Sequence, residues 1–228
     1  MSGDPKGYIT NAARVVCRGE DNHVHELYLT DQWYHFDMTG IPGAVPAAGD
    51  PMGYVGGVPR VVYRGVDNRI HEFSLTDQWY HFDMTGIPGA VPAAGDPMGY
   101  VGGVPRVVYR GVDNRIHEFS LTDQWYHFDM MGIPGAVPAA GDPMGYVGGV
   151  PRVVYRGVDN RIHEFSLTDQ WYHFDMTGIP GAVPAAGDPM GYVGGVPRVV
   201  YRGVDNRIHE FSLADQWYHF DMINGVSP

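Results

Sequence analysis

The sequence is poor in cysteine: Cys17 is the only one among 228 residues. A lone cysteine forms no internal disulfide and no cysteine-based metal site. We therefore expect Cys17 to be a small buried residue on a strand.

Basic residues are also few. Lys and Arg number 15 against 26 Asp and Glu, which gives a net charge of −11. No run of Lys or Arg supplies the basic patch of a nucleic-acid-binding surface, or one suited to an anionic membrane. No stretch approaches the roughly 20 apolar residues of a membrane helix, and the N-terminus shows no signal peptide. We expect neither a nucleic-acid partner nor membrane insertion, and the compartment stays open.

Helical periodicity and catalytic motifs are missing as well. No window sustains a 3.6-residue apolar period, so helix should be nearly absent. The sequence contains no Gly-x-Ser-x-Gly, phosphate loop or His-Glu-x-x-His motif. A hydrolase needs carboxylates tuned differently from one another, which the near-identical repeats of this chain do not favour. The sequence therefore predicts neither an enzyme nor a cofactor.

What the sequence does have is glycine and proline, 32 and 18 residues, arranged with a period of 46. Asp-Pro pairs mark the starts of five repeats, at Asp4, Asp50, Asp96, Asp142 and Asp188. The predicted boundaries are 4–49, 50–95, 96–141, 142–187 and 188–228, within a single domain over 1–228.

The repeats are almost identical. Repeats two, three and four differ at one position, where Met131 replaces Thr85 and Thr177, and repeat one is the outlier. Natural arrays drift apart with age, so near-identity indicates recent amplification of one unit or deliberate design. We favour an engineered or reconstructed protein.

Each repeat carries four strand patterns, which in repeat two cover residues 52–55, 60–64, 70–75 and 78–84. Four strands in a repeat of this length are typical of a propeller blade. We predict an all-β fold, a five-bladed β-propeller with four antiparallel strands per blade. An open β-solenoid is the alternative fold. The ring is expected to close within one chain, with a larger ring of several chains as the alternative.

The hairpin turn decides which side chains share a face. A three-residue turn at Val66-Asp67-Asn68 places Arg60 and Glu72 on one mostly polar face. A two-residue turn would mix polar and apolar side chains on both faces. The three-residue turn segregates them better, and we predict it.

Arg60, Glu72 and Trp79 then form a candidate binding site. A guanidinium donates several hydrogen bonds, a carboxylate accepts several, and an indole offers a flat apolar face. A sugar ring presents the matching mixture of hydroxyls and C–H groups. The alternative is an interblade salt bridge capped by tryptophan, which would lock each blade to the next. The predicted sets are Arg14, Glu26, Trp33; Arg60, Glu72, Trp79; Arg106, Glu118, Trp125; Arg152, Glu164, Trp171; and Arg198, Glu210, Trp217.

The motif Arg60-Val-Val-Tyr63, Asp67-Asn-Arg-Ile-His-Glu72 and Gln78-Trp-Tyr80 resembles the blade of the Aleuria-type fucose-binding lectins. The resemblance implies that arginine, glutamate and tryptophan bind a fucose-like sugar in pockets between blades. It implies glycans as partners, bound at up to five equivalent sites.

The chain also departs from that family. The family usually has six blades and often carries tryptophan where this chain has Leu75. Five-bladed lectins of the tachylectin type also bind sugars. The runner-up interpretation is a symmetric scaffold without a ligand, in which the arginine and glutamate serve only packing.

Two histidines, His71 and His81, recur in every repeat with Asp83 and account for ten of the 11 histidines. Such a group could hold a metal, but the predicted register places His71 on the face opposite Glu72. We expect ordinary strand histidines and no metal site.

Overall fold

The computed structural model describes residues 3–223, which form two compact parts. The first contains the described residues up to Asp113 together with His117–Phe128, and the second contains Asn114–Ile116 and the described residues from Asp129 onwards. A single domain over the whole chain stays a prediction. Among residues 3–223, no helix is long and apolar enough to cross a membrane.

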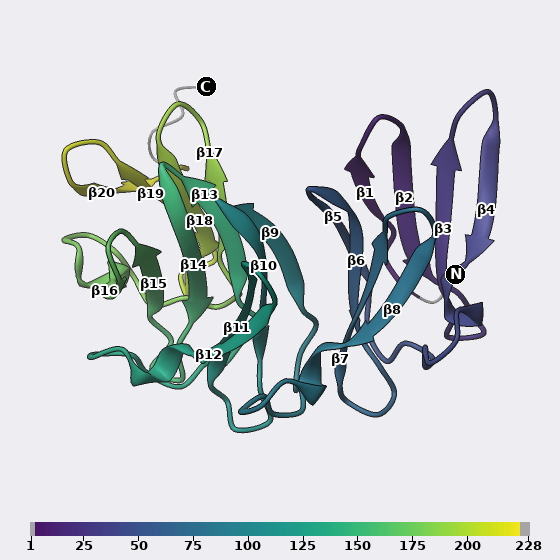
Figure 1. The fold of residues 1–228 in the computed structure, drawn as a ribbon. Helices are drawn as coiled ribbons and strands as arrows, with labels where there is room; N and C mark the ends of the chain where they lie inside the picture. Colours follow the sequence, from purple (N-terminus) through teal and green to yellow (C-terminus); the bar gives the residue numbers. More distant parts are fainter. Residues whose placement is uncertain (1–2, 224–228) are drawn as a thin grey trace. The chain divides into compact units, whose positions relative to one another are not determined.

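Each repeat forms its own sheet of four strands in sequence order (Figure 1). The first strands are β1 (Lys6–Ile9), β5 (Met52–Gly56), β9 (Met98–Gly102), β13 (Met144–Gly148) and β17 (Met190–Val193). The second strands are β2 (Ala13–Arg18), β6 (Val58–Arg64), β10 (Val104–Arg110), β14 (Val150–Arg156) and β18 (Pro197–Arg202). The third strands are β3 (Val24–Leu29), β7 (Ile70–Leu75), β11 (Ile116–Leu121), β15 (Ile162–Leu167) and β19 (Ile208–Leu213). The fourth strands are β4 (Trp33–Asp37), β8 (Trp79–Asp83), β12 (Trp125–Asp129), β16 (Trp171–Asp175) and β20 (Trp217–Asp221).

Helix is confined to single 3₁₀ turns in the described part of the chain, as the missing periodicity predicted. These turns are η1 (Met38–Gly40), η2 (Met84–Gly86), η3 (Met130–Gly132) and η4 (Met176–Gly178). The predicted strands agree closely with those observed, except that β6 begins two residues early, at Val58. The reason is Gly57, whose positive φ of 75° makes a turn tight enough for Gly56 to pair with Val58.

The predicted hairpin register is confirmed. Arg64 pairs with Ile70 across β6 and β7, which leaves a three-residue turn beyond the Gly65–Arg69 hydrogen bond. Asn68 adopts the left-handed conformation with φ of 60°, which asparagine tolerates better than most residues. Arg60 and Glu72 therefore lie on one face of the sheet.

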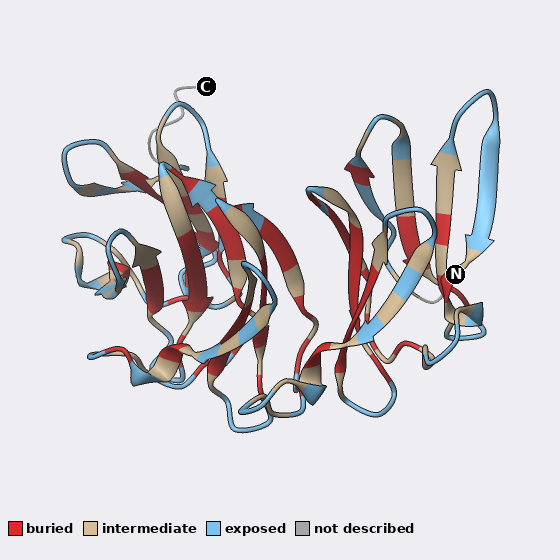
Figure 2. Cartoon of the chain, viewed as in Figure 1, coloured by how far each residue is buried: buried red, intermediate tan, exposed pale blue. Residues whose placement is uncertain are grey.

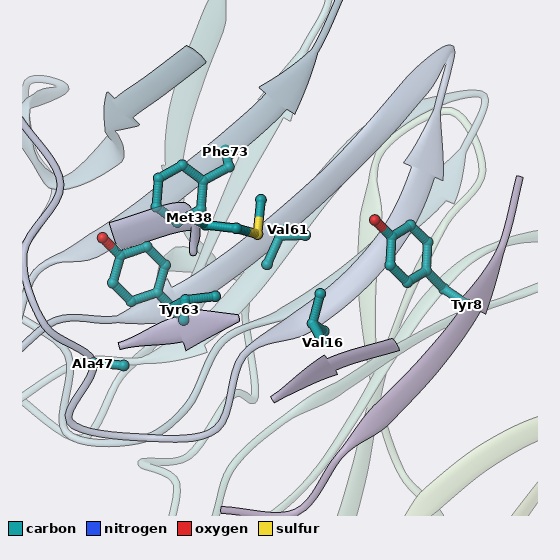
Figure 3. Close-up of a cluster of buried hydrophobic side chains, with 8 residues drawn as sticks. Tyr8, Val16, Met38, Ala47, Val61, Tyr63 and Phe73 are labelled. Atoms are coloured by element: carbon teal, nitrogen blue, oxygen red, sulfur yellow. The ribbon is translucent and has the colours of Figure 1, made fainter. Parts of the chain in front are cut away.

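Cores lie between the sheets of repeats one and two, two and three, and four and five. Buried residues concentrate in the second and third strands, whereas the fourth strand is intermediate or exposed (Figure 2). One cluster joins Tyr8, Val16, Met38 and Ala47 of repeat one to Val61, Tyr63 and Phe73 of repeat two (Figure 3). A single sheet cannot bury both of its faces, so each repeat depends on its neighbour for a core. The prediction for Cys17 is confirmed, because it is buried on β2.

The first strands of neighbouring repeats pack through a tyrosine and a glycine. A Cβ on Gly53 would lie 2.2 Å from a ring carbon of Tyr8, and one on Gly99 would lie 2.3 Å from Tyr54. The rings therefore rest directly on the next backbone. Only glycine leaves room for that approach.

The segment between repeats ties two hairpins together. The Ala93 amide donates to the carbonyl of Asn68 in its own repeat at 2.7 Å. The next amide, from Ala94, donates to the carbonyl of Arg110 in the following repeat at 2.9 Å. This irregular, proline-broken segment thus satisfies backbone groups of two sheets at once.

Replacing Gly53 with alanine should destabilise the protein by about 1–3 kcal/mol, because the ring of Tyr8 has to move from a packed position. Gly40→Ala is the matched control, since a Cβ there would meet no atom within 4 Å. Urea unfolding of both variants measures the difference. Equal stabilities would contradict the predicted tyrosine–glycine packing.

Candidate functional site

A buried set of arginine, glutamate and tyrosine lies on one face of each sheet. In repeat two, Arg60 Nη1 donates to Glu72 Oε2 at 2.8 Å, and Arg60 Nε donates to the carbonyl of Gly56 at 3.1 Å. The hydroxyl of Tyr54 donates to Glu72 Oε1 at 2.8 Å. Both carboxylate oxygens of Glu72 therefore receive a hydrogen bond.

The same three residue types meet in each of the other four repeats. The sets are Tyr8, Arg14 and Glu26; Tyr100, Arg106 and Glu118; Tyr146, Arg152 and Glu164; and Tyr192, Arg198 and Glu210. The predicted arginine–glutamate pairs thus lie in contact in all five repeats. The tyrosine was not predicted, although it recurs six residues before the arginine, on the neighbouring strand.

Burial sets the protonation of this group. It raises the pKa of Glu72 above its ordinary value, while the Arg60 charge and hydrogen bonds from Arg60, Tyr54 and Trp125 oppose that rise. In repeat four, burial raises the pKa of Glu164 to about 7. Burial and the nearby carboxylate raise the pKa of Tyr54 well above its ordinary value. The tyrosine therefore keeps its proton and acts as the donor.

The structure groups the tryptophans differently from the sequence prediction. Arg60 and Glu72 meet Trp125 of the next repeat, whose ring centre lies 5.6 Å from the Arg60 guanidinium carbon. Trp79 pairs with Leu75 across β7 and β8, which places it on the face opposite Glu72. Period-2 alternation on the fourth strand therefore turns Trp79, Trp125 and Trp217 toward the preceding repeat.

Grooves follow these interfaces. The first groove, about 930 Å³, includes Arg14, Glu26 and Tyr28 of repeat one with Leu75, Gln78 and Trp79 of repeat two. The second, about 870 Å³, includes Phe82, Ile87 and Pro88 of repeat two with Leu121, Gln124 and Trp125 of repeat three. The third, about 810 Å³, includes Phe174, Ile179 and Pro180 of repeat four with Leu213, Gln216 and Trp217 of repeat five.

The groove walls include residues that the sequence analysis missed. Phe82 pairs with Glu72 across β7 and β8, so it shares the arginine–glutamate face. Ile87 and Pro88, just beyond η2, add to the same wall. The sequence contained a signal for Phe82. Side chains alternate between faces along the fourth strand, so Phe82, three residues after Trp79, lies on the face opposite to the tryptophan. Leu121, the counterpart of Leu75, lines the opposite wall beside Trp125.

Two of the remaining predicted residues, Arg198 and Trp33, are more exposed than their counterparts in repeat two. The side chain of Arg198 is 31% exposed, compared with 11% for Arg60. Trp33 on β4 is 51% exposed, and Trp171 begins β16. The Arg152–Glu164 pair repeats the arrangement of repeat two, because the Arg152 guanidinium lies 5.6 Å from the ring centre of Trp217.

The histidines form a separate polar chain on the opposite face. His71 Nε2 lies 3.1 Å from Asp67 Oδ1, and His71 Nδ1 lies 3.0 Å from His81 Nε2. Their neighbours thus satisfy the ring nitrogens along a line rather than around one point. Within residues 3–223, no cluster of three or more His, Cys, Asp or Glu side chains has the geometry to hold a metal ion.

No protein-family model and no curated protein matches this sequence. Solved structures do match the fold of this chain. A mutant Aleuria aurantia lectin in complex with alpha-methyl-L-fucoside is 15% identical, with a TM-score of 0.57 over 92% of this chain and 72% of that one. The SapL1 lectin in complex with alpha methyl fucoside is 18% identical, with a TM-score of 0.59 over 97% and 80%. A fungal lectin described as a six-bladed β-propeller, also an Aleuria aurantia lectin, is 15% identical, with a TM-score of 0.59 over 95% and 77%.

The chain has a β-propeller fold. Its five four-stranded sheets are the blades, and the predicted fold class is confirmed. The predicted resemblance to the Aleuria-type lectins is confirmed as a likeness of fold.

Removing one member of the buried pair should be costly. Arg60→Ala leaves the Glu72 carboxylate buried with only Tyr54 and Trp125 as donors, which should cost about 3–5 kcal/mol. The double variant Arg60→Met with Glu72→Gln keeps an acceptor for Tyr54 without a buried charge, and should cost less. Urea unfolding distinguishes them, and an equally stable single variant would contradict this role of the pair.

The histidine chain predicts a pH dependence. Burial and the neighbouring His71 lower the pKa of His81, and burial likewise lowers those of His173 and His219. In the unfolded chain these histidines have their ordinary pKa of about 6.5, so they bind protons at a pH where the folded histidines are still neutral. Proton binding therefore favours the unfolded state, and the protein loses stability as pH falls. Replacing all three with glutamine should reduce the loss of stability measured between about pH 7 and about pH 5.5.

His23→Gln is the control of opposite sign. A hydrogen bond to Asp37 raises the pKa of His23, so its contribution to stability is present at low pH and is lost as pH rises. That variant should lose more stability than the parent over the same interval. The same change in both variants would contradict the assignment.

Proposed function

We propose that this β-propeller is a multivalent lectin that binds one sugar residue in each groove between consecutive blades. A fucose-like sugar is the proposed ligand. Its action is binding without catalysis. The proposal rests chiefly on the recurrence of one groove, with aromatic and aliphatic walls from two blades, beside a buried arginine–glutamate pair.

The groove walls favour a sugar with an apolar patch. In the second groove Phe82, Ile87 and Pro88 face residues from the next blade, among them Leu121 and Trp125. Aromatic and aliphatic walls suit the C–H face of a pyranose and the methyl group of a 6-deoxy sugar. The solved structures of similar fold include lectins in complex with methyl fucosides. These observations together support a fucose-like ligand.

Polar groups at the groove edges supply the other half of sugar recognition. Gln124 and Asp83 line the second groove, and Arg14 and Glu26 line the first. Amides, carboxylates and guanidinium groups donate to and accept from vicinal hydroxyls. Single sites of this size would be weak, and repetition along a glycan-bearing surface would supply avidity.

The second candidate is a scaffold without a ligand. The observation in its favour is the buried and satisfied state of Glu72, whose two oxygens are already engaged by Tyr54 and Arg60. In that case the grooves would be gaps between blades and nothing more. Sugar binding that depends on groove residues decides between the two candidates.

Each sugar site should depend on residues from two consecutive blades, so changing residues of one groove should abolish that site alone. Isothermal titration with methyl α-L-fucoside counts the sites per chain. Trp125→Leu combined with Glu72→Gln should remove one site, because Trp125 lines the second groove and the Glu72 side chain lies beside it as its hydrogen-bond partner. Trp79→Leu combined with Glu72→Gln should remove two, since Trp79 lines the first groove.

Val66→Ser, at an exposed turn, is the control and should leave the number of sites unchanged. Methyl α-L-galactoside, which adds a hydroxyl at C6, should bind more weakly because that hydroxyl would lose water against an apolar wall. Absence of binding by the parent protein to any glycan on an array would overturn the lectin proposal in favour of the scaffold.

A further inference from the structure

The first groove differs from the other two in its chemistry. The wall residues Ile41, Pro42 and Trp79 of the first groove have counterparts at the same repeat positions in the other two grooves. Arg14, Glu26 and Tyr28 also line the first groove, but the residues at the same repeat positions do not line the other two. The polar pair thus borders the first groove directly.

Two sequence differences change how the arginine is held. Thr10 stands where repeat two has Gly56, and Tyr28 stands where it has Ser74. Arg14 Nε accordingly donates to the Thr10 hydroxyl at 3.2 Å. Its guanidinium carbon lies 5.4 Å from the ring centre of Tyr28, on the same sheet. In repeats two and four the arginine lies over the tryptophan of the next blade instead.

The carboxylate changes with it. Both Tyr8, at 2.5 Å, and Arg14, at 2.8 Å, donate to the same oxygen of Glu26, Oε1. Oε2 is buried and has no hydrogen-bond partner among the described residues. Glu26 itself is 0% exposed and lines the groove. A buried carboxylate oxygen without a donor is a strong acceptor for an incoming hydroxyl.

We propose that the first groove is a sugar site of its own kind, in which Glu26 Oε2 accepts a ligand hydroxyl and Tyr28 determines affinity. Tyr28 holds Arg14 on its own sheet, and the indole of Trp79 is the apolar platform for the sugar ring. The ligand class is a pyranoside with one hydroxyl directed at Glu26 and an apolar face toward Trp79. This inference rests on the proposed lectin function.

Titration with methyl α-L-fucoside tests it, because the sites should fall into two classes. The parent should show one tighter site per chain and a weaker remainder. Tyr28→Ser combined with Thr10→Gly gives repeat one the residues of repeat two, and should weaken the tighter site by about tenfold or more. The reciprocal variant, Ser74→Tyr with Gly56→Thr, should create a second tighter site.

Arg60→Met with Glu72→Gln is the matched control and should leave the tighter site intact. An unchanged isotherm for the repeat-one variant, or loss of the tighter site in this control, would overturn the inference alone. Equivalent sites throughout the parent would do the same. A parent that binds no fucoside would overturn the inference together with the fucose assignment. Circular dichroism at the titration temperature confirms that each variant is folded.

Discussion

The structure depends on a buried tyrosine–glutamate contact between two strands of one blade. The Tyr8 hydroxyl fixes Glu26, and the ring of the same tyrosine rests on Gly53 of the next blade. One side chain therefore positions the carboxylate and also sets the distance between blades. A buried carboxylate is tolerated only with close donors, so the spacing of the blades and the hydrogen bonding of Glu26 depend on the same side chain.

Much of this architecture follows from local rules that the sequence obeys strictly. Asn68 accepts a left-handed turn, and alternation then assigns Arg60 and Glu72 to one face of the hairpin. These are properties of one repeat, and the copies repeat them unchanged. The strand boundaries and the arginine–glutamate pairs were predictable for that reason.

The tryptophan assignment required more than the repeat itself. Trp79 follows Glu72 closely in sequence, yet it pairs with Leu75 and so lies on the other face of its sheet. Alternation alone could have separated Trp79 from Glu72. Whether the Trp79 ring packs against the preceding or the following blade depends on contacts between repeats. Near-identical repeats offer the same residues on both sides, so their sequence does not distinguish the two neighbours. Phe82 pairs with Glu72 across β7 and β8, so alternation from Trp79 along the fourth strand places it on the arginine–glutamate face.

Blades of the same architecture need not be equivalent in chemistry, and the glutamates of repeats one and two illustrate why. Glu72 has a separate donor for each oxygen, so a ligand hydroxyl would compete with bonds already made. Glu26 has two donors on one oxygen, and its other oxygen is left for a ligand. A satisfied buried network rigidifies a fold, whereas an incomplete one carries a desolvation cost that binding can remove. Thr10 and Tyr28, which replace Gly56 and Ser74 of repeat two around the arginine, thus accompany the change from a satisfied network to a receptive one within the same four-stranded blade.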